Sequence, residues 1–242
     1  MPRMTPTTLI IRTAGTNCDR ELAHAFEVAG ARTKTVHLNT LIEQPALVDS
    51  FDLIGVPGGF SYGDDIAAGR ILANRLRHRL VDPLRHAIKC GVPIIGICNG
   101  FQVLVKMGLL PDPSPGSGNV QQATLADNTT GRFIDRWVSL RVPDDTVCIW
   151  TKGLDAFDLP IAHGEGRFVP ATNELLDQWR SQGQIALTYA PDDNPNGSTA
   201  DIAGVCDPTG RVLGLMPHPE RCTHVTHRPD WSRATAEQLA EA

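Results

Sequence analysis

The feature that most constrains this chain is an apolar strand that ends at a cysteine flanked by glycines. Val92–Ile97 (VPIIGI) has no polar side chain, and the helical sequence Asn99–Gly108 (NGFQVLVKMG) follows it. Strands that are apolar throughout are buried on both faces, as in a parallel sheet covered by helices. In Gly96-Ile97-Cys98-Asn99-Gly100, glycines stand two residues before and two after the cysteine. This spacing is typical of a nucleophile elbow with cysteine in place of serine.

Such an elbow would place the Cys98 sulfur at the N-terminus of a helix. The helix amides and dipole would favour the reactive thiolate, and the backbone N–H of Asn99 would face a developing oxyanion. Glycines at 96 and 100 would let strand and helix approach each other without a clash. We therefore predict that Cys98 is a nucleophile. The alternative is a buried cysteine of the core.

A base for this nucleophile is predicted in Met216–Arg221 (MPHPER), which follows the strand-like sequence VLGLM. With one residue between them, His218 and Glu220 can point the same way, so that the carboxylate orients the imidazole. A third strand, Phe51–Val56, ends at the pair Gly58-Gly59, whose bare amides suit an oxyanion hole. All three pieces fall at the carboxyl ends of predicted strands, where open α/β sheets bind ligands.

The rest of the chain predicts an α/β fold. We expect a single domain over residues 1–242, with a mostly parallel, mixed and twisted sheet flanked by helices, and a polar tail after about residue 222. Helical sequence fills Asp65–Lys89, with a break near Asp82-Pro83, and Pro111–Gly118 is a loop. The remaining strands are expected at Thr8–Thr13, Lys34–Leu38, Arg132–Val142, Val147–Trp150, Phe168–Val169, Ile185–Tyr189, Ala203–Cys206 and Val212–Met216.

Composition excludes several classes of protein. A formal net charge of −5 argues against nucleic acid or a membrane as the main partner. The N-terminal sequence does not have the pattern of a signal peptide, and no run approaches the ~18 apolar residues of a membrane span. We expect a cytoplasmic protein whose six cysteines are free thiols. None has C-x-x-C spacing, and we predict no metal site, although Cys222, His224 and His227 are a weak alternative.

The motifs together resemble the triad-type glutamine amidotransferases. The resemblance rests on GICNG with Gln102 four residues after the cysteine, and on the late His-Pro-Glu. Further blocks resemble the glutaminase subunits of phosphoribosylformylglycinamidine synthases of purine biosynthesis. Those blocks are GTNCDRE, PGGFSYGD, IAHGEGR, NPNGS and GLMPHPER, and they run in order over nearly the whole chain.

The resemblance implies a flavodoxin-like amidotransferase fold and a role for each matched residue. Cys98 would be the nucleophile, His218 the base and then the acid, and Glu220 the group that orients His218. A larger group of residues would bind glutamine and form the oxyanion hole. Within this group, Glu165 is expected to contact the α-ammonium of the substrate. That group is Gly58, Gly59, Asn99, Gln102, His163, Gly164 and Glu165. One departure from the family is Asp65, where an aromatic residue is common.

The implied activity is hydrolysis of glutamine through a Cys98 thioester. The ammonia would pass to a large ATP-dependent synthase subunit, which converts formylglycinamide ribonucleotide to formylglycinamidine ribonucleotide. A small accessory subunit is expected in the same complex. No cofactor is expected in this chain, which lacks a G-x-x-x-x-G-K-[ST] phosphate loop; ATP and Mg²⁺ would belong to the partner.

Three other interpretations stay open on the sequence. The first is a glutaminase subunit of another amidotransferase complex. The second is a cysteine hydrolase with a different substrate, and the third is a non-catalytic subunit. The order of His218 before Glu220 disfavours an α/β-hydrolase, and a non-catalytic subunit is expected to lose one of the three triad residues. Cys18 is a candidate second thiol, but it lacks elbow glycines and a paired histidine. We expect it to be structural.

Overall fold

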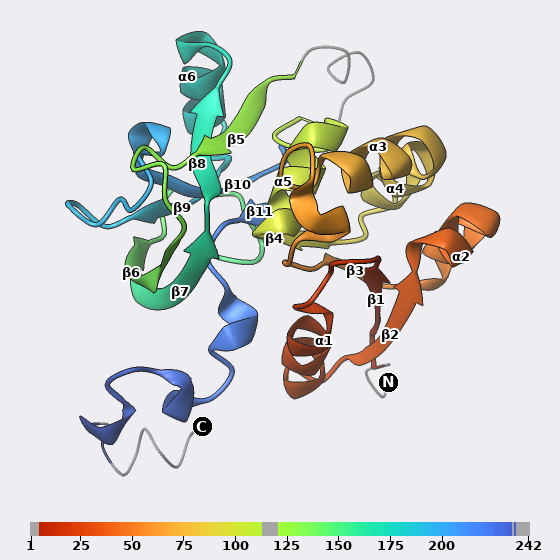
Figure 1. Cartoon of the computed structure of the whole chain (residues 1–242), viewed down its shortest axis with the longest axis horizontal. Coiled ribbons are helices and arrows are strands. Elements are labelled where there is room, and N and C mark those ends of the chain that lie inside the picture. The colour runs from red at the N-terminus through yellow and green to blue at the C-terminus, as the bar shows by residue number, and fades with distance from the viewer. Residues whose placement is uncertain (1–4, 113–120, 234, 236–242) are drawn as a thin grey trace.

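A computed structural model of the chain describes residues 5–112, 121–233 and 235. Within that part, the main sheet has nine strands in the order β2-β1-β3-β4-β11-β10-β9-β6-β7, and β5 and β8 form a separate antiparallel pair. Figure 1 shows the two halves of the main sheet on either side of β4 and β11. The prediction of a mostly parallel, mixed α/β sheet is confirmed.

The parallel half of the sheet carries the pieces expected at the site. Its strands are β2 (Arg32–His37), β1 (Thr7–Arg12), β3 (Leu53–Val56), β4 (Ile94–Ile97) and β11 (Val212–Leu215), each parallel to its neighbour. Since β3, β4 and β11 are adjacent and parallel, the segments that follow them emerge at one edge of the sheet.

The other half is antiparallel and continues from β11. Its strands are β10 (Ile202–Cys206), β9 (Ile185–Tyr189), β6 (Ile134–Arg141) and β7 (Phe157–His163), while the separate pair is β5 (Ala123–Asp127) and β8 (Glu165–Pro170). Strand β10 is buried at every residue, whereas β6 alternates between exposed and buried residues over its second half.

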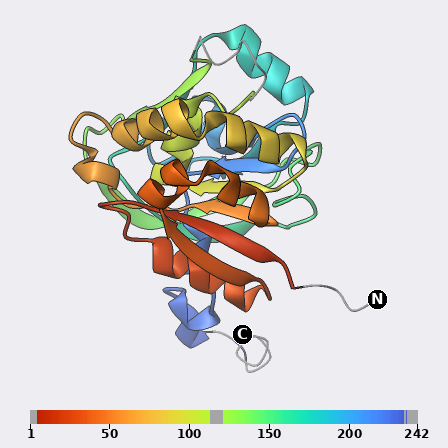
Figure 2. The same cartoon turned by 90° about the vertical axis from the view of Figure 1, so that its right-hand side faces the viewer.

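Helices cover both faces of the parallel half. Figure 2 shows α1 on one side of these strands and α3 and α4 on the other. Helix α5, which is buried along most of its length, packs on β4, β11 and α3. The helices are α1 (Asp19–Val28), α2 (Leu38–Glu43), α3 (Arg70–Arg79), α4 (Val81–Lys89), α5 (Asn99–Met107) and α6 (Asn173–Ser181). No helix in the described part of the chain is long and apolar enough to cross a membrane.

One hydrophobic cluster joins the elements on both faces of the sheet. It includes Leu9 and Ile10 of β1, Ile94 of β4, and Phe101 of α5, all fully buried. Phe101 explains a glycine in β11, because a Cβ atom at Gly214 would lie 2.0 Å from the Phe101 ring. A single domain over residues 1–242 stays a prediction.

Three predicted elements differ in the structure. Val147–Trp150 is not a strand: its amides bond to loop carbonyls, with Val147 N–H donating to Gly183 O (2.9 Å). The helix expected from Asp65 begins only at Arg70, because Gly69 has a left-handed φ of 70°. The break between helices lies at Leu80, two residues before the predicted one.

Other elements were missed. No strand was predicted for β5 or β7 and no helix for α2 or α6, since Phe157–His163 contains a proline and α2 is only six residues long. The loop predicted at Pro111–Gly118 lies mostly outside the described residues; Pro111 and Asp112 are described.

Candidate active site

The turn between β4 and α5 has the geometry of a nucleophile elbow. Cys98 directly precedes α5 with φ 50° and ψ −107°, a strained conformation for a residue with a side chain. A Cβ at Gly100 would lie 1.9 Å from the carbonyl oxygen of Val56, and one at Gly96 would lie 2.6 Å from Leu104 Cδ1. Both glycines are therefore required by the close approach of strand, helix and neighbouring strand.

The Cys98 thiol is buried, and its S–H donates to the carbonyl oxygen of Ala162 over 3.8 Å. Burial raises the pKa of Cys98 to about 12, and the nearby charge of Glu220 adds to this shift. The backbone N–H of Asn99 favours the thiolate, but more weakly. The Asn99 N–H therefore acts in the predicted direction, and burial outweighs it. The nucleophile is held as a thiol, which must lose its proton to a base.

His218 and Glu220 form a buried pair just after β11. Nδ1 of His218 lies 2.6 Å from Oε1 of Glu220, and both side chains are almost inaccessible to solvent. With Nδ1–H donating to the carboxylate, the lone pair lies on Nε2, which has no hydrogen-bond partner among the described residues. The imidazole is thus oriented by Glu220 and has a nitrogen free to accept a proton.

Strand β7 connects the nucleophile to the base. The carbonyl oxygen of Ala162 accepts from the Cys98 thiol, and the carbonyl oxygen of Pro160, two residues earlier, accepts from the backbone N–H of His218 at 2.9 Å. The same short stretch of β7 therefore contacts both Cys98 and His218. The sheet order and this strand together bring the two predicted catalytic residues to one site.

The Gly58-Gly59 turn after β3 lies against the base. A Cβ at Gly58 would lie 3.0 Å from Cε1 of His218 and 3.4 Å from Sγ of Cys18, so glycine leaves room for the imidazole. Gly59 has φ 133°, and a Cβ there would lie 2.7 Å from the backbone nitrogen of Asn17. The turn is held because Cys18 N–H donates to Gly58 O (3.3 Å). Its use as an oxyanion hole remains a prediction.

Asn99 and Gln102 are buried at the start of α5, and their amides bond to the protein. Asn99 Nδ2 donates to Gln102 Oε1 (3.0 Å) and to Asp64 Oδ1 (3.1 Å), and Gln102 Nε2 donates to the carbonyl oxygen of Glu165. The Glu165 carboxylate accepts from Ala68 N–H at 3.2 and 3.3 Å. These side chains join α5 to the predicted glutamine-binding segment; direct contact with glutamine stays a prediction.

His163 stands at the end of β7 and is buried. Its Nδ1 lies 3.1 Å from Asn128 Oδ1, while its Nε2 has no hydrogen-bond partner in the described part of the chain. Burial and, to a smaller degree, the proximity of His218 lower the pKa of His163 to about 4, so the ring is neutral at neutral pH. A Cβ at Gly166 would lie 2.2 Å from this ring, whereas one at Gly164 would find its nearest atom at 3.9 Å.

Cys18, which the sequence predicted to be structural, lies at this site. Its buried sulfur accepts a hydrogen bond from Arg221 Nη2 (3.0 Å). Cys18, His218 and Glu220 each place one possible metal-ligand atom so that the three atoms lie within 4.8 Å of one another. The position of Cys18 could have been inferred from the order of the strands. Its segment GTNCDRE follows β1, which neighbours β3 and ends at the same edge of the sheet.

A thiol, an imidazole and a carboxylate at this spacing have the donor types of a zinc site. His218 and Glu220 are, however, bonded to each other in the manner of a base and its orienting group. The absence of a metal therefore stays a prediction. The alternative set of Cys222, His224 and His227 does not form a comparable cluster among the residues that the structure describes.

Comparison with known proteins assigns the chain to a class. The family described as CobB/CobQ-like glutamine amidotransferase domain matches residues 5–241. Together with the mixed sheet and the cysteine elbow, this match defines a glutamine amidotransferase, as the motifs predicted.

More specific relatives refine the class. The chain is 44% identical over 231 residues to phosphoribosylformylglycinamidine synthase subunit PurQ of Dehalococcoides mccartyi, covering 93% of this chain and 88% of that protein. It is 41% identical to the PurQ subunit of Methanococcus maripaludis, covering 96% and 88%. It is also similar to a chain in the structure of PurLQS from Thermotoga maritima, with a TM-score of 0.74 and 33% identity over 98% and 99% of the two chains. The chain belongs to the PurQ family of glutamine amidotransferases.

Proposed function

We propose that this chain is the glutaminase subunit of a phosphoribosylformylglycinamidine synthase. It hydrolyses glutamine to glutamate and ammonia, and the ammonia aminates formylglycinamide ribonucleotide in the ATP-dependent synthase subunit. The observation that carries the proposal is the buried His218–Glu220 pair (2.6 Å) at the same sheet edge as the Cys98 elbow. The PurQ relatives supply the identity of the synthase.

In the first half-reaction, Nε2 of His218 takes the proton of the Cys98 thiol as the sulfur attacks the side-chain carbonyl carbon of glutamine. The negative charge that develops on the carbonyl oxygen is stabilised by backbone N–H groups at Asn99 and the Gly58-Gly59 turn. His218 then gives its proton to the departing nitrogen, and ammonia leaves. Glu220 stabilises the imidazolium that exists between these two steps.

In the second half-reaction, water hydrolyses the thioester. His218 removes a proton from the water, whose oxygen attacks the acyl carbon, and returns the proton to the leaving Cys98 sulfur. Glutamate is released and the thiol is restored. The raised pKa of Cys98 fits this cycle, because its neutral thiol form is regenerated with each turnover.

The partner of this chain is the synthase subunit. The similar chain from Thermotoga maritima belongs to the structure of PurLQS. We infer that the sheet edge bearing Cys98 faces the synthase, which supplies ATP and Mg²⁺, so that ammonia is delivered directly. A small accessory subunit and a cytoplasmic location are part of the same proposal.

The experiment is a comparison of nitrogen sources. In the assembled complex, Cys98→Ala should abolish glutamine-dependent amidine formation, a loss on the order of 10⁴ or more, and leave ammonia-dependent formation intact. Cys90→Ala is the matched control, because Cys90 is exposed at the end of α4. Equal loss of both activities in Cys98→Ala would contradict the proposed division of labour.

A further inference from the structure

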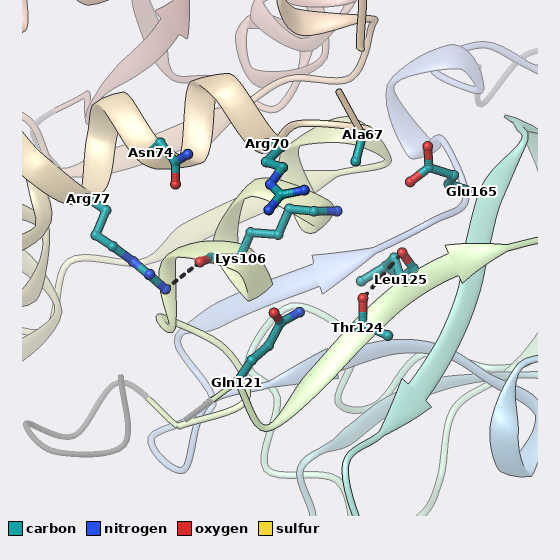
Figure 3. Close-up of a pocket in the computed structure, with 9 residues that line it drawn as sticks. All are labelled: Ala67, Arg70, Asn74, Arg77, Lys106, Gln121, Thr124, Leu125 and Glu165. Atoms are coloured by element: carbon teal, nitrogen blue, oxygen red, sulfur yellow. Dashed lines mark hydrogen bonds between the residues drawn. The ribbon is translucent and has the colours of Figure 1, made fainter. Parts of the chain in front are cut away.

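A polar hollow of about 530 Å³ adjoins the candidate active site and shares Glu165 with it. Its walls are the face of α3, the last turn of α5, β5 and the start of β8, as Figure 3 shows. The volume is within the range of small-molecule sites. Lys106 of the hollow follows Cys98 by eight residues, most of them on α5, so the two lie ~12 Å apart along the helix axis.

Three cationic side chains line this hollow. Arg70 and Arg77 are seven residues apart on α3, with Asn74 between them, so all three share one face of the helix. Lys106 comes from the opposite wall. Figure 3 shows the Arg70 and Lys106 side chains next to each other, and Arg77 Nη2 donates to the carbonyl oxygen of Lys106 at 2.6 Å. That bond holds one end of the Arg77 guanidinium and leaves its other donors available.

The positive charge of the hollow is neutralised only in part by the residues that the structure describes. None of the three cations forms a salt bridge with a carboxylate among the described residues. Glu165 is the single acidic residue of the lining, and its carboxylate already accepts from Ala68 N–H. Burial lowers the pKa of Lys106, the carboxylates of Glu165 and Asp64 raise it, and Arg70 lowers it by the smallest amount. An anion in the hollow would pair with the guanidinium group of Arg70.

We propose that the hollow binds a phosphorylated small molecule, whose phosphate is held by Arg70 and Lys106. Three cations and one carboxylate leave two positive charges, which match the charge of about −2 on a phosphate monoester. Guanidinium groups bind phosphate oxygens through paired N–H donors. The organic part of the ligand lies toward Gln121 and Thr124 on the β5 side, where an amide and a hydroxyl line the wall.

Occupancy of the hollow is communicated to the candidate active site through two elements. Glu165 lines the hollow, and its carbonyl oxygen accepts from Gln102 of the elbow helix. Lys106 is on the same helix, whose first residue follows Cys98. The ligand therefore contacts the elements that position the nucleophile but does not contact the nucleophile itself.

The test is calorimetric titration of the full chain with ribose 5-phosphate, ribose and inorganic phosphate. The proposal expects ribose 5-phosphate and phosphate to bind and ribose not to bind. Arg70→Gln and Lys106→Gln should each weaken binding about tenfold or more, since each removes a charge-assisted contact. Arg79→Gln is the matched control, because Arg79 is exposed on α3 but does not line the hollow. Cys98→Ala should bind normally.

Two results would overturn the proposal. One is binding of ribose 5-phosphate that is no tighter than that of ribose, which is also the result expected if the hollow instead receives an acidic segment of the synthase. The other is equal weakening by Arg79→Gln and Arg70→Gln, which would indicate a diffuse surface charge. Thermal unfolding of each variant separates lost binding from lost folding.

Discussion

The guanidinium of Arg221 donates a hydrogen bond to the sulfur of Cys18 at 3.0 Å, beside the candidate catalytic pair. The site thus contains two buried thiols, Cys18 and Cys98, and only Cys98 lies at an elbow. Burial raises the pKa of the Cys18 thiol despite the arginine. Cys18 is therefore expected to hold Arg221 next to Glu220 and not to act as a second nucleophile.

The first prediction concerns which thiol reacts. A diazo-ketone analogue of glutamine should label Cys98 alone, because only its sulfur faces an acyl group bound at the elbow, and excess glutamine should protect it. Peptide mapping by mass spectrometry identifies the labelled cysteine. Cys18→Ala should leave the label on Cys98. A label found on Cys18 in the unaltered chain would overturn the assignment of the nucleophile.

The second prediction separates the roles of the base and its orienting group. His218→Ala should lower kcat for glutamine hydrolysis on the order of 10⁴, because proton transfer fails in both half-reactions. Glu220→Gln should cost less, on the order of 10², since the imidazole remains present but loses its charged partner. Steady-state kinetics of the complex measures both. Equal losses in the two variants would mean that the carboxylate takes part directly in the chemistry.

The third prediction concerns the ionisation of Cys98. Because burial raises its pKa to about 12, the thiolate fraction should rise about tenfold for each pH unit across the neutral and mildly alkaline range. Alkylation of Cys98 by iodoacetamide, followed by mass spectrometry, should therefore accelerate from pH 7 to pH 9 without a plateau. A plateau below pH 8 would show that stabilisation of the thiolate at the helix N-terminus outweighs burial.

The fourth prediction is that His163 makes the free energy of unfolding fall in acid. Its pKa falls from 6.5 to about 4 on folding, so between these values the unfolded chain binds more protons than the folded one. Stability from this group is complete above pH 6.5 and declines as pH falls toward 4, by about 3 kcal/mol. Urea unfolding of the wild type and His163→Gln at both pH values tests this. An equally steep decline in the variant would contradict it.

The fifth prediction compares two glycines of the candidate site. Gly100→Ala should lower the free energy of unfolding by about 3 kcal/mol or more, since the new Cβ would lie 1.9 Å from the backbone oxygen of Val56. Gly164→Ala should change it little, because its Cβ would meet no atom closer than 3.9 Å. Chemical denaturation gives both values. A Gly100→Ala variant of normal stability would show that strand and helix can separate at the elbow.

The local geometry of the candidate site could be predicted from the sequence. The elbow around Cys98 and the pair His218–Glu220 depend on residues close together in the chain, where spacing limits the geometry directly. Their placement at one edge was also predictable, because the carboxyl ends of parallel strands lie at the same edge of a sheet. The family resemblance identified the same segments.

Only the tertiary structure decided the rest. Cys18 and Arg221 are 203 residues apart in the chain, and their contact exists because β1 and β11 end at the same edge. Burial of the Cys98 thiol, which outweighs the helix N-terminus, is likewise set by packing from distant strands such as β7. The meeting of α3 and α5 around Arg70 and Lys106 has the same origin, because hydrophobic periodicity shows which face of a helix is buried but not which distant element covers it.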